Sequence, residues 1–474
     1  MTSNEQPVSV PPEADHLKRG TIGGVGLTFM VVAVAAPLTA MASNLSLSLG
    51  FGVGAGTVGL LVIVAVALTI FASAFVSLAR HVTNAGAYYA FIGFGLGSTV
   101  GSGAAFVATT AYNMAAAGMA AATGYFFDST MQAAFDIEAP WYVYAAVTLL
   151  LTAWFGRRGV EVTKHLITVV SLLQFALLIV LAIAVGIQRP SGWKLDVFSP
   201  SAMLDGNIAL TLAFCVLSFV GFEATAIYGE EAKAARKSIK WATYASIILL
   251  VGVFVVATWS LVAAFDDVKA VAAEDPGALV FRTADIYLGE WSGTLMSVLV
   301  TISFFAASVA FHNMAARYHF ALGRADLLPA RLKTVHPRWG TPSTAGTVQI
   351  VISVLVLLPF IVSGSDPIVN LFPMVSGVTS VSLITLMIGC CISVLVAVYR
   401  KKLPTGRWAT VIAPSIAGLC LLTVLVVIIA NYSDVTGSTK LVVTLMPLLP
   451  IAAALYGAGR QRRIGVHKEL SVVE

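Results

Sequence analysis

An apolar stretch near the middle of the chain carries a glycine and an acidic residue. Residues 217–225 read Leu-Ser-Phe-Val-Gly-Phe-Glu-Ala-Thr and lie inside a longer apolar segment, 207–229. Glu223 is the only acidic residue that we place well inside such a segment, and an ionised carboxylate at membrane depth costs several kcal/mol unless it is paired, hydrated or protonated. Gly221 weakens a helix just before it. We therefore expect a broken helix with a functional carboxylate; the alternative is that Glu223 caps the break or bonds a neighbouring helix.

The composition around this stretch is that of a polytopic membrane protein. Of the 474 residues, 58% are hydrophobic and 11% are charged, and the mean hydropathy is +0.90. A soluble domain carries roughly 25% charged residues, so the balance excludes a soluble globular chain, and it is the reverse of a disordered one. Apolar runs of about 20 residues fit helices that cross roughly 30 Å of hydrocarbon, and they exclude the short alternating strands of a β-barrel.

We predict twelve membrane-spanning helices joined by mostly short hydrophilic connections. Their approximate ranges are 21–48, 55–79, 97–127, 140–156, 163–188, 207–229, 238–265, 291–319, 343–363, 367–399, 408–431 and 440–459. The longest outer connection is 266–290.

The basic residues are distributed unevenly between alternate connections. If the N-terminus is inside, the outer connections hold only five of the 28 Lys and Arg residues, namely Arg189, Lys194, Lys269, Arg282 and Lys440. The positive-inside rule then places both termini in the cytoplasm. The net charge of +5 thus reflects topology, and we expect no nucleic-acid partner. The apolar region after the polar start is too long for a cleavable signal peptide. We expect a multi-pass protein of a bacterial inner (plasma) membrane, with the lipid bilayer as partner.

A second break is predicted in the first span. Pro37 has no N–H and clashes with the carbonyl four residues back, which frees the carbonyl of Ala33. The alternative is a proline kink in a packed bundle. The two breaks fall in the first span of each of two five-span halves, and matched interruptions point to a transport site near the midplane. Half-helix ends with unpaired N–H and C=O groups suit a zwitterion such as an α-amino acid.

Four segments resemble the amino acid–polyamine–organocation (APC) superfamily of permeases. They are residues 77–89, 158–160, the stretch from Gly221-Phe222-Glu223 through 229–233 to 237–239, and the stretch from Arg317 to Gly340-Thr341-Pro342. The third is the most specific, because it is similar to the family's GFE…EEAK…RSIP pattern. The resemblance covers nearly the whole chain.

The resemblance implies an all-α polytopic membrane protein with twelve transmembrane helices. It would be a five-plus-five inverted repeat (APC/LeuT-like) with broken helices 1 and 6, working by alternating access. We expect a cytoplasmic N-terminal tail at 1–19, a first repeat at 20–190, a second repeat at 205–400, helices 11 and 12 at 408–459, and a cytoplasmic C-terminal tail at 460–474.

The resemblance places the substrate between the two breaks. In the family the first break usually reads Gly-Ser-Gly and gives its amides to the substrate carboxylate; here it reads Pro37-Leu38-Thr39, so an amine without a carboxylate becomes an alternative. For an amino acid we expect the carboxylate on the amides near Thr39 and Ala40; for a diamine, Glu223 would pair with the second ammonium. The candidate substrate-binding residues are Ala36, Pro37, Leu38, Thr39, Ala40, Tyr112, Asn113, Phe219, Gly221, Glu223 and Phe311.

Three of these candidates come from the third and eighth spans. Tyr112 and Asn113 lie where relatives line the site, but neighbours on a helix point in different directions, so we expect at most one to face the substrate. Packing between helices is an equal alternative for either residue. Phe311 resembles an aromatic residue that covers the substrate in relatives.

Coupling candidates follow from the same resemblance. Glu223 is similar to a proton-sensing glutamate in an arginine/agmatine exchanger of the superfamily. Gln174 stands where proton-coupled relatives often have a lysine, so it is either a neutral hydrogen-bonding replacement or a packing residue. His312 is a candidate proton relay, although a lone membrane His more often bonds a neighbouring helix. Ser303 and Ser308 are speculative sodium ligands. We expect H⁺ rather than Na⁺ as the coupling ion.

We therefore predict a secondary active transporter, a symporter or antiporter, for an amino acid or related amine. The alternatives are a polyamine or organic amine importer of the same fold, and a non-transporting membrane receptor for amino acids. The spans contain no evident catalytic set, so we do not expect an enzyme or a cofactor. The four cysteines have neither metal-site spacing nor a disulfide pattern.

Overall fold

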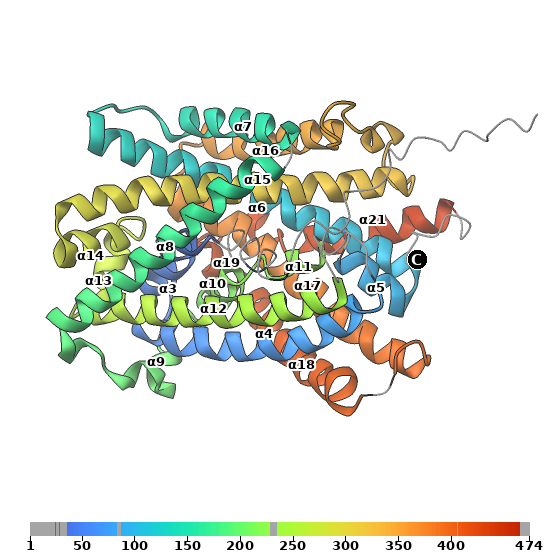
Figure 1. Ribbon diagram of the computed structural model, residues 1–474, viewed down its shortest axis with the longest axis horizontal. Helices are drawn as coiled ribbons and strands as arrows, with labels where there is room; N and C mark the ends of the chain where they lie inside the picture. The colour runs from blue at the N-terminus through green and yellow to red at the C-terminus, as the bar shows by residue number, and fades with distance from the viewer. Residues whose placement is uncertain are drawn as a thin grey trace, which may run out of the picture.

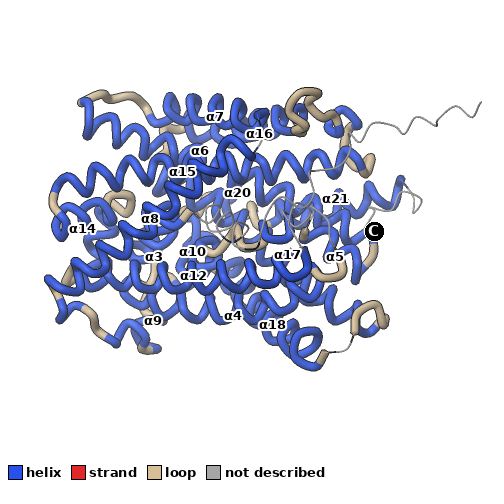
Figure 2. The backbone as a smooth tube through the Cα atoms, viewed as in Figure 1, coloured by secondary structure: helices blue, strands red, loops and turns tan. Residues whose placement is uncertain are grey.

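A computed structural model describes residues 24, 28, 36–82, 87–158, 160–227, 235–404 and 406–464. These residues form helices and connecting loops and contain no strand (Figure 2). Each of the twelve predicted spans coincides with one or more helices within this described part. The predicted all-α class is therefore confirmed.

The first five predicted spans correspond to α2 (Pro37–Ala40) with η1 (Met41–Leu45) and α3 (Ser46–Phe51), then α4 (Thr57–Ala79), α6 (Ser98–Phe135), α7 (Trp141–Arg158) and α8 (Val160–Gln188). The next five correspond to α10 (Ile208–Ser218) with α11 (Ala224–Ile227), then α12 (Ala235–Ala264), α15 (Glu290–Arg324), α16 (Ser343–Val362), and η7 (Pro367–Leu371) with α17 (Phe372–Tyr399). The last two are η8 (Arg407–Ile412) with α18 (Ala413–Ala430), and α20 (Leu441–Thr444) with α21 (Leu448–Ile464).

Seven helical segments of the described residues are long and apolar enough to cross a membrane on their own. They contain α4, α8, α12, α15, α16, α17 and α18. The remaining predicted spans depart from this pattern for identifiable reasons. The segments that begin with α2, α10 and α20 are broken into shorter helices, α6 is rich in Ala, Gly and Thr, and α7 ends in two arginines.

The long helices lie side by side, with α6 and α15 through the middle of the bundle (Figure 1). Helix α6 contacts α7, α15, α17 and α21. Its small side chains allow these close approaches: a Cβ added to Gly103 would lie 2.9 Å from the Ala454 carbonyl oxygen of α21. Helices α7 and α16 form an outer layer on one side of this pair, and α4, α12 and α18 lie on the other (Figure 1).

The predicted outer connection 266–290 contains two helices that the sequence analysis did not anticipate. They are α13 (Val268–Glu274) and α14 (Leu279–Leu288), and α14 buries Leu279, Val280, Thr283 and Ala284. A further short helix, α5 (Tyr88–Leu96), packs against α6 and α17. The other short elements are η2 (Gly54–Gly56), η3 (Pro190–Gly192), η4 (Leu195–Phe198), α9 (Pro200–Met203), η6 (Ala330–Lys333) and α19 (Tyr432–Thr436).

Connections that are rich in basic residues meet at one end of the bundle. Thr341 donates its hydroxyl to the carbonyl of Arg157 at 2.8 Å, and Arg460 donates to the carbonyl of Asp326 at 3.4 Å. These bonds join the loop before α16 to the end of α7, and α21 to the end of α15. The two ion pairs among the described residues, Arg189–Asp266 and Arg282–Glu274, fall in predicted outer connections. Which membrane face each end meets stays a prediction.

Candidate substrate and coupling site

The sixth predicted span is broken where the sequence indicated. Helix α10 ends at Ser218, residues 219–223 form turns, and α11 begins at Ala224. Gly221 has φ +116°, a conformation that residues with a Cβ rarely adopt. The glycine therefore permits the turn that separates α10 from α11 and that contains Glu223.

The Glu223 carboxylate is fully buried in this break. Its Oε2 accepts a hydrogen bond from the backbone N–H of Gly221 at 2.8 Å, and its Oε1 accepts one from the Tyr112 hydroxyl of α6 at 3.1 Å. Buried carboxylates need such donors because they have lost their water. Among the described side chains, no Lys, Arg or His forms an ion pair with Glu223. The Glu223 carboxyl group is therefore held in a fixed orientation by neutral donors, and no described cation forms an ion pair with it.

Aromatic side chains surround Tyr112. Its ring lies 5.3 Å from the ring of Tyr318 and 6.3 Å from that of Phe311, both on α15. Tyr318 was not predicted as a site residue, although it lies seven residues, or two helical turns, after Phe311 and therefore on the same face of the helix. Tyr88, which is fully buried near Glu223, was not predicted as a site residue either. Phe219 instead packs against Phe254 of α12, with 5.7 Å between ring centres.

The first predicted break is described from Ala36 onward, and Ala33 lies outside the described residues. Ala36 adopts a left-handed conformation with φ 41°, directly before Pro37 at the start of α2. The Ala36 carbonyl accepts hydrogen bonds from the Thr39 amide at 2.9 Å, the Thr39 hydroxyl at 2.5 Å and the Ala40 amide at 3.4 Å. The amides that we expected to bind a carboxylate are thus occupied within the first turn. Residues 36–40, which include Leu38, are all buried.

Comparison of the sequence with known protein families identifies the family of the protein. The sequence model of a family described as amino acid permease matches residues 22–453, which is most of the chain. The chain belongs to the amino acid permease family. Within the permease, the matched region contains both breaks and Glu223.

Curated relatives of the permease are distant and match it over part of their length. The branched-chain amino acid permease BcaP of Bacillus subtilis (strain 168) is 23% identical over 266 residues, 55% of this chain and 51% of that protein. The low-affinity putrescine importer PlaP of Escherichia coli (strain K12) is 25% identical over 210 residues, 43% of this chain and 46% of that protein. The permease thus spans about half the length of these curated relatives.

Solved structures similar to the permease show its fold. A mutant manganese transporter of Eremococcus coleocola has a TM-score of 0.53 and 14% identity, over 96% of this chain and 99% of that chain. The same transporter in complex with an aromatic bis-isothiourea compound has a TM-score of 0.52 and 14% identity, over the same shares of the two chains. The permease has the predicted all-α five-plus-five fold with broken helices, to which two further helices are added.

Gln174 of the permease lies between α8 and α15. It is buried, and its Oε1 accepts a hydrogen bond from the Ser303 hydroxyl at 3.2 Å. Helix α2 contacts both α8 and α15. The Ser308 hydroxyl lies 3.4 Å from that of Thr152 on α7, so the two serines point to different helices. In the described part of the chain, no three His, Cys, Asp or Glu residues gather as metal ligands.

Asn113 and His312 contact polar partners other than Glu223. Asn113 donates to the Thr109 carbonyl at 2.7 Å and lies 3.0 Å from Nε2 of His319. His312 lies with its Nδ1 2.5 Å from Oε1 of Gln349 on α16. The structure therefore brings Tyr112, Phe311 and Glu223 together, and it places Asn113, His312 and Ser308 against other helices.

Proposed function

We propose that the permease is a secondary active transporter that carries an amino acid or related amine across the plasma membrane by alternating access. The observation that carries the proposal is the buried Glu223 carboxylate, which lies in a broken helix and has two neutral donors. Its hydrogen bonds to Tyr112 and Gly221 orient it without neutralising it. A substrate ammonium supplies the missing positive charge, and the cost of burying either ion is then offset by the other.

The aromatic residues around Glu223 are proposed to enclose the substrate. Tyr112, Phe311 and Tyr318 form one group of rings beside the carboxylate. Such rings exclude water and attract a cation through their faces. Because Tyr112 belongs to α6 and the other two rings to α15, relative movement of these helices would open or close the site.

A proton is the proposed coupling ion. Glu223 is a buried titratable group in the second break. In this proposal its carboxyl group binds a proton when the substrate ammonium leaves. Gln174 is neutral and already bonded to Ser303. Ser303 and Ser308 bond different helices, which argues against their joint use as sodium ligands. The proposal includes both proton-coupled uptake and substrate exchange.

An amine without a carboxylate is the second candidate substrate. Pro37 lacks an amide proton, and the amides of Thr39 and Ala40 are bonded to the Ala36 carbonyl. This leaves fewer donors for a substrate carboxylate than an open first turn would provide. The putrescine importer PlaP, to which the chain is similar, is named for such a substrate. We also propose that both termini are cytoplasmic and that the two repeats have the boundaries predicted from the sequence.

The test is uptake of labelled leucine and putrescine into proteoliposomes that contain the full chain, with and without an inward proton gradient. We expect the uptake of one substrate class to saturate with increasing substrate concentration. An excess of the other class should not inhibit this uptake. Uptake of leucine would support the hypothesis of an amino acid substrate, and uptake of putrescine would support the hypothesis of an amine substrate. Binding without uptake of either would favour the receptor, and neither binding nor uptake of any common amino acid or amine would contradict the proposed function.

A further inference from the structure

The outer layer of the bundle formed by α7 and α16 has an apolar surface. Val147 and Leu150 on α7, and Val351 and Leu355 on α16, are all exposed. Both helices lie at the edge of the molecule (Figure 1). In a membrane protein such a surface faces lipid chains.

Arginine and tryptophan side chains lie together at one end of this surface. The Arg158 guanidinium lies 4.0 Å from the ring centre of Trp154 and 5.7 Å from that of Trp339, and Arg338 lies 4.8 Å from the ring of Trp339. Tryptophan gathers where the membrane meets water, and the cations lie over ring faces. No described carboxylate pairs with either arginine.

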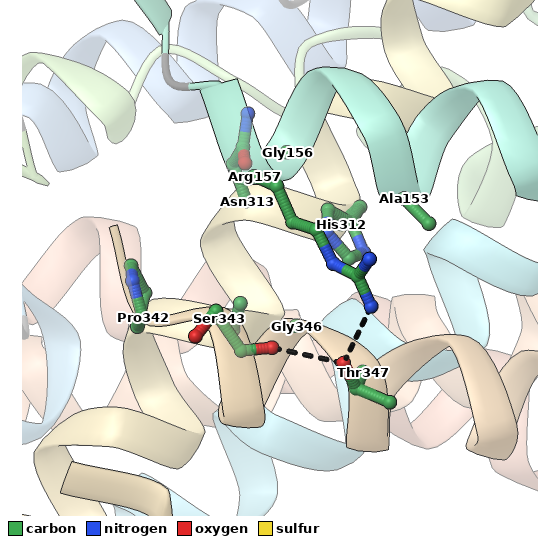
Figure 3. Close-up of a pocket in the computed structure, with 10 residues that line it drawn as sticks. Ala153, Gly156, Arg157, His312, Asn313, Pro342, Ser343, Gly346 and Thr347 are labelled. Atoms are coloured by element: carbon green, nitrogen blue, oxygen red, sulfur yellow. Dashed lines mark hydrogen bonds between the residues drawn. The ribbon is translucent and has the colours of Figure 1, made fainter. Parts of the chain in front are cut away.

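A small pocket lies beside this group, between α7, α15 and α16. Arg157 reaches across it from α7, and its Nη2 lies 3.5 Å from the Thr347 hydroxyl (Figure 3). Helix α16 begins at Ser343 and has no side-chain cap. The N-terminus of a helix attracts anions through its free N–H groups and its dipole. The pocket volume of about 20 Å³ has room for one or two water molecules.

A buried histidine faces this pocket. His312 is 3% exposed, and its Nδ1 is bonded to Gln349, whose amide donates to Ser353 at 2.8 Å. The Nε2 lies against the pocket wall: a Cβ on Gly156 would be 2.4 Å from it, and one on Gly346 would be 3.3 Å away. The wall of the pocket therefore includes one edge of the His312 imidazole ring.

We propose that this end of α7 and α16 binds the phosphate of an anionic phospholipid headgroup. Arg157, Arg158 and Arg338 supply the charge, and the start of α16 supplies backbone donors. Arginine pairs with phosphate oxygens through two parallel hydrogen bonds, and basic pockets between membrane helices bind anionic headgroups. The continuous apolar surface of α7 and α16 favours a lipid over free phosphate, because acyl chains fit along it.

The test is native mass spectrometry of the detergent-purified full chain with added phosphatidylglycerol or phosphatidylcholine. We expect the wild type to retain phosphatidylglycerol preferentially. The double variant Arg157→Gln/Arg158→Gln should weaken that binding about tenfold or more, since each cation near a lipid surface contributes on the order of 1 kcal/mol. The charge-preserving Arg157→Lys/Arg158→Lys should retain the preference in part. Size-exclusion profiles identify any variant that fails to fold.

The matched control is Arg462→Gln/Arg463→Gln, which removes two exposed arginines from the end of α21. It should keep the preference; an equal loss in both double variants would overturn the proposal. Stabilisation by inorganic phosphate without any lipid preference would identify a free-anion site and also overturn it. The side chain of Glu161 lies outside the described part of the chain. If the preference for phosphatidylglycerol appears in the variant Glu161→Gln and not in the wild type, Glu161 neutralises the arginines in the wild type. The proposal would then be wrong.

Discussion

Glu223 and His312 are both buried titratable side chains, yet they belong to different kinds of surroundings. Glu223 lies in a broken helix between α10 and α11, and its carboxylate is held by Tyr112 and Gly221. His312 lies within the unbroken α15 and is bonded to the neutral amide of Gln349 on the outer helix α16. Burial alone therefore does not identify the proposed transport site. The backbone around the side chain distinguishes the two regions.

The comparison shows why a break matters for function. Residues 219–223 form turns, so their backbone makes fewer helical hydrogen bonds than a continuous helix does. Fewer hydrogen bonds therefore have to break when this segment moves. A continuous helix such as α15 can move as a unit but resists local change. A carboxylate at a break can thus change partners at low cost, whereas a histidine on a packed helix keeps its partner. Substitutions in the two regions should therefore affect transport to different extents.

Gly221→Ala should have the largest effect. A side chain at φ +116° introduces strain of about 1–3 kcal/mol, and relief of that strain moves the N–H that binds Glu223. We expect the uptake rate to fall more than about tenfold, because 1.4 kcal/mol corresponds to a factor of ten. Gly252→Ala is the control, since its Cβ would meet nothing within 4 Å on α12. If both variants transport equally, the conformation of Gly221 is unimportant.

Tyr112→Phe should have an intermediate effect. It removes the 3.1 Å hydrogen bond to Glu223 and keeps the ring beside Tyr318. A hydrogen bond to a charged group contributes about 1.5–3 kcal/mol, so substrate affinity should fall about tenfold. Tyr432→Phe is the matched control, because the Tyr432 hydroxyl is also buried without a hydrogen-bond partner in the described structure and lies on α19, beside Gly377 of α17. Measured substrate dissociation constants should separate the two variants, and equal constants would remove Tyr112 from the site.

His312→Gln should have the smallest effect on transport. The histidine bonds α16 rather than Glu223, so the uptake rate per folded molecule and its pH dependence should stay within about twofold of the wild type. The melting temperature should fall, because a buried hydrogen bond contributes about 1 kcal/mol. Thermal unfolding and uptake, measured on the same preparation, check both expectations. A pH dependence lost in His312→Gln would make this residue part of the coupling path.

The two breaks and the spans were predictable because each has a direct cause in the sequence. Pro37 lacks an N–H, Glu223 is a charge in an apolar run, and apolar length sets the spans. The partners of the side chains were not predictable. Phe311 and His312 are adjacent, yet only the packing of α15 against α6 and α16 decides which of them approaches Tyr112.

The missed elements have a similar explanation. Helices α13 and α14 lie in a hydrophilic connection, and α14 is amphipathic rather than apolar throughout. Their packing against the bundle supplies the stability that a short isolated helix lacks. Ser303 shows the same limit, because nothing in its spacing indicates the hydrogen bond to Gln174 across two helices.

Proton-driven uptake by the variant Glu223→Gln is the decisive measurement, because it shows whether the Glu223 carboxyl group couples transport to protons. Proteoliposomes with the wild type, Glu223→Gln or the exposed-acid control Glu290→Gln would receive labelled substrate with and without an inward proton gradient. The account predicts that the gradient stimulates the wild type and Glu290→Gln and has no effect on Glu223→Gln, whose amide cannot exchange a proton. Gradient-stimulated uptake by Glu223→Gln at the wild-type rate would contradict it.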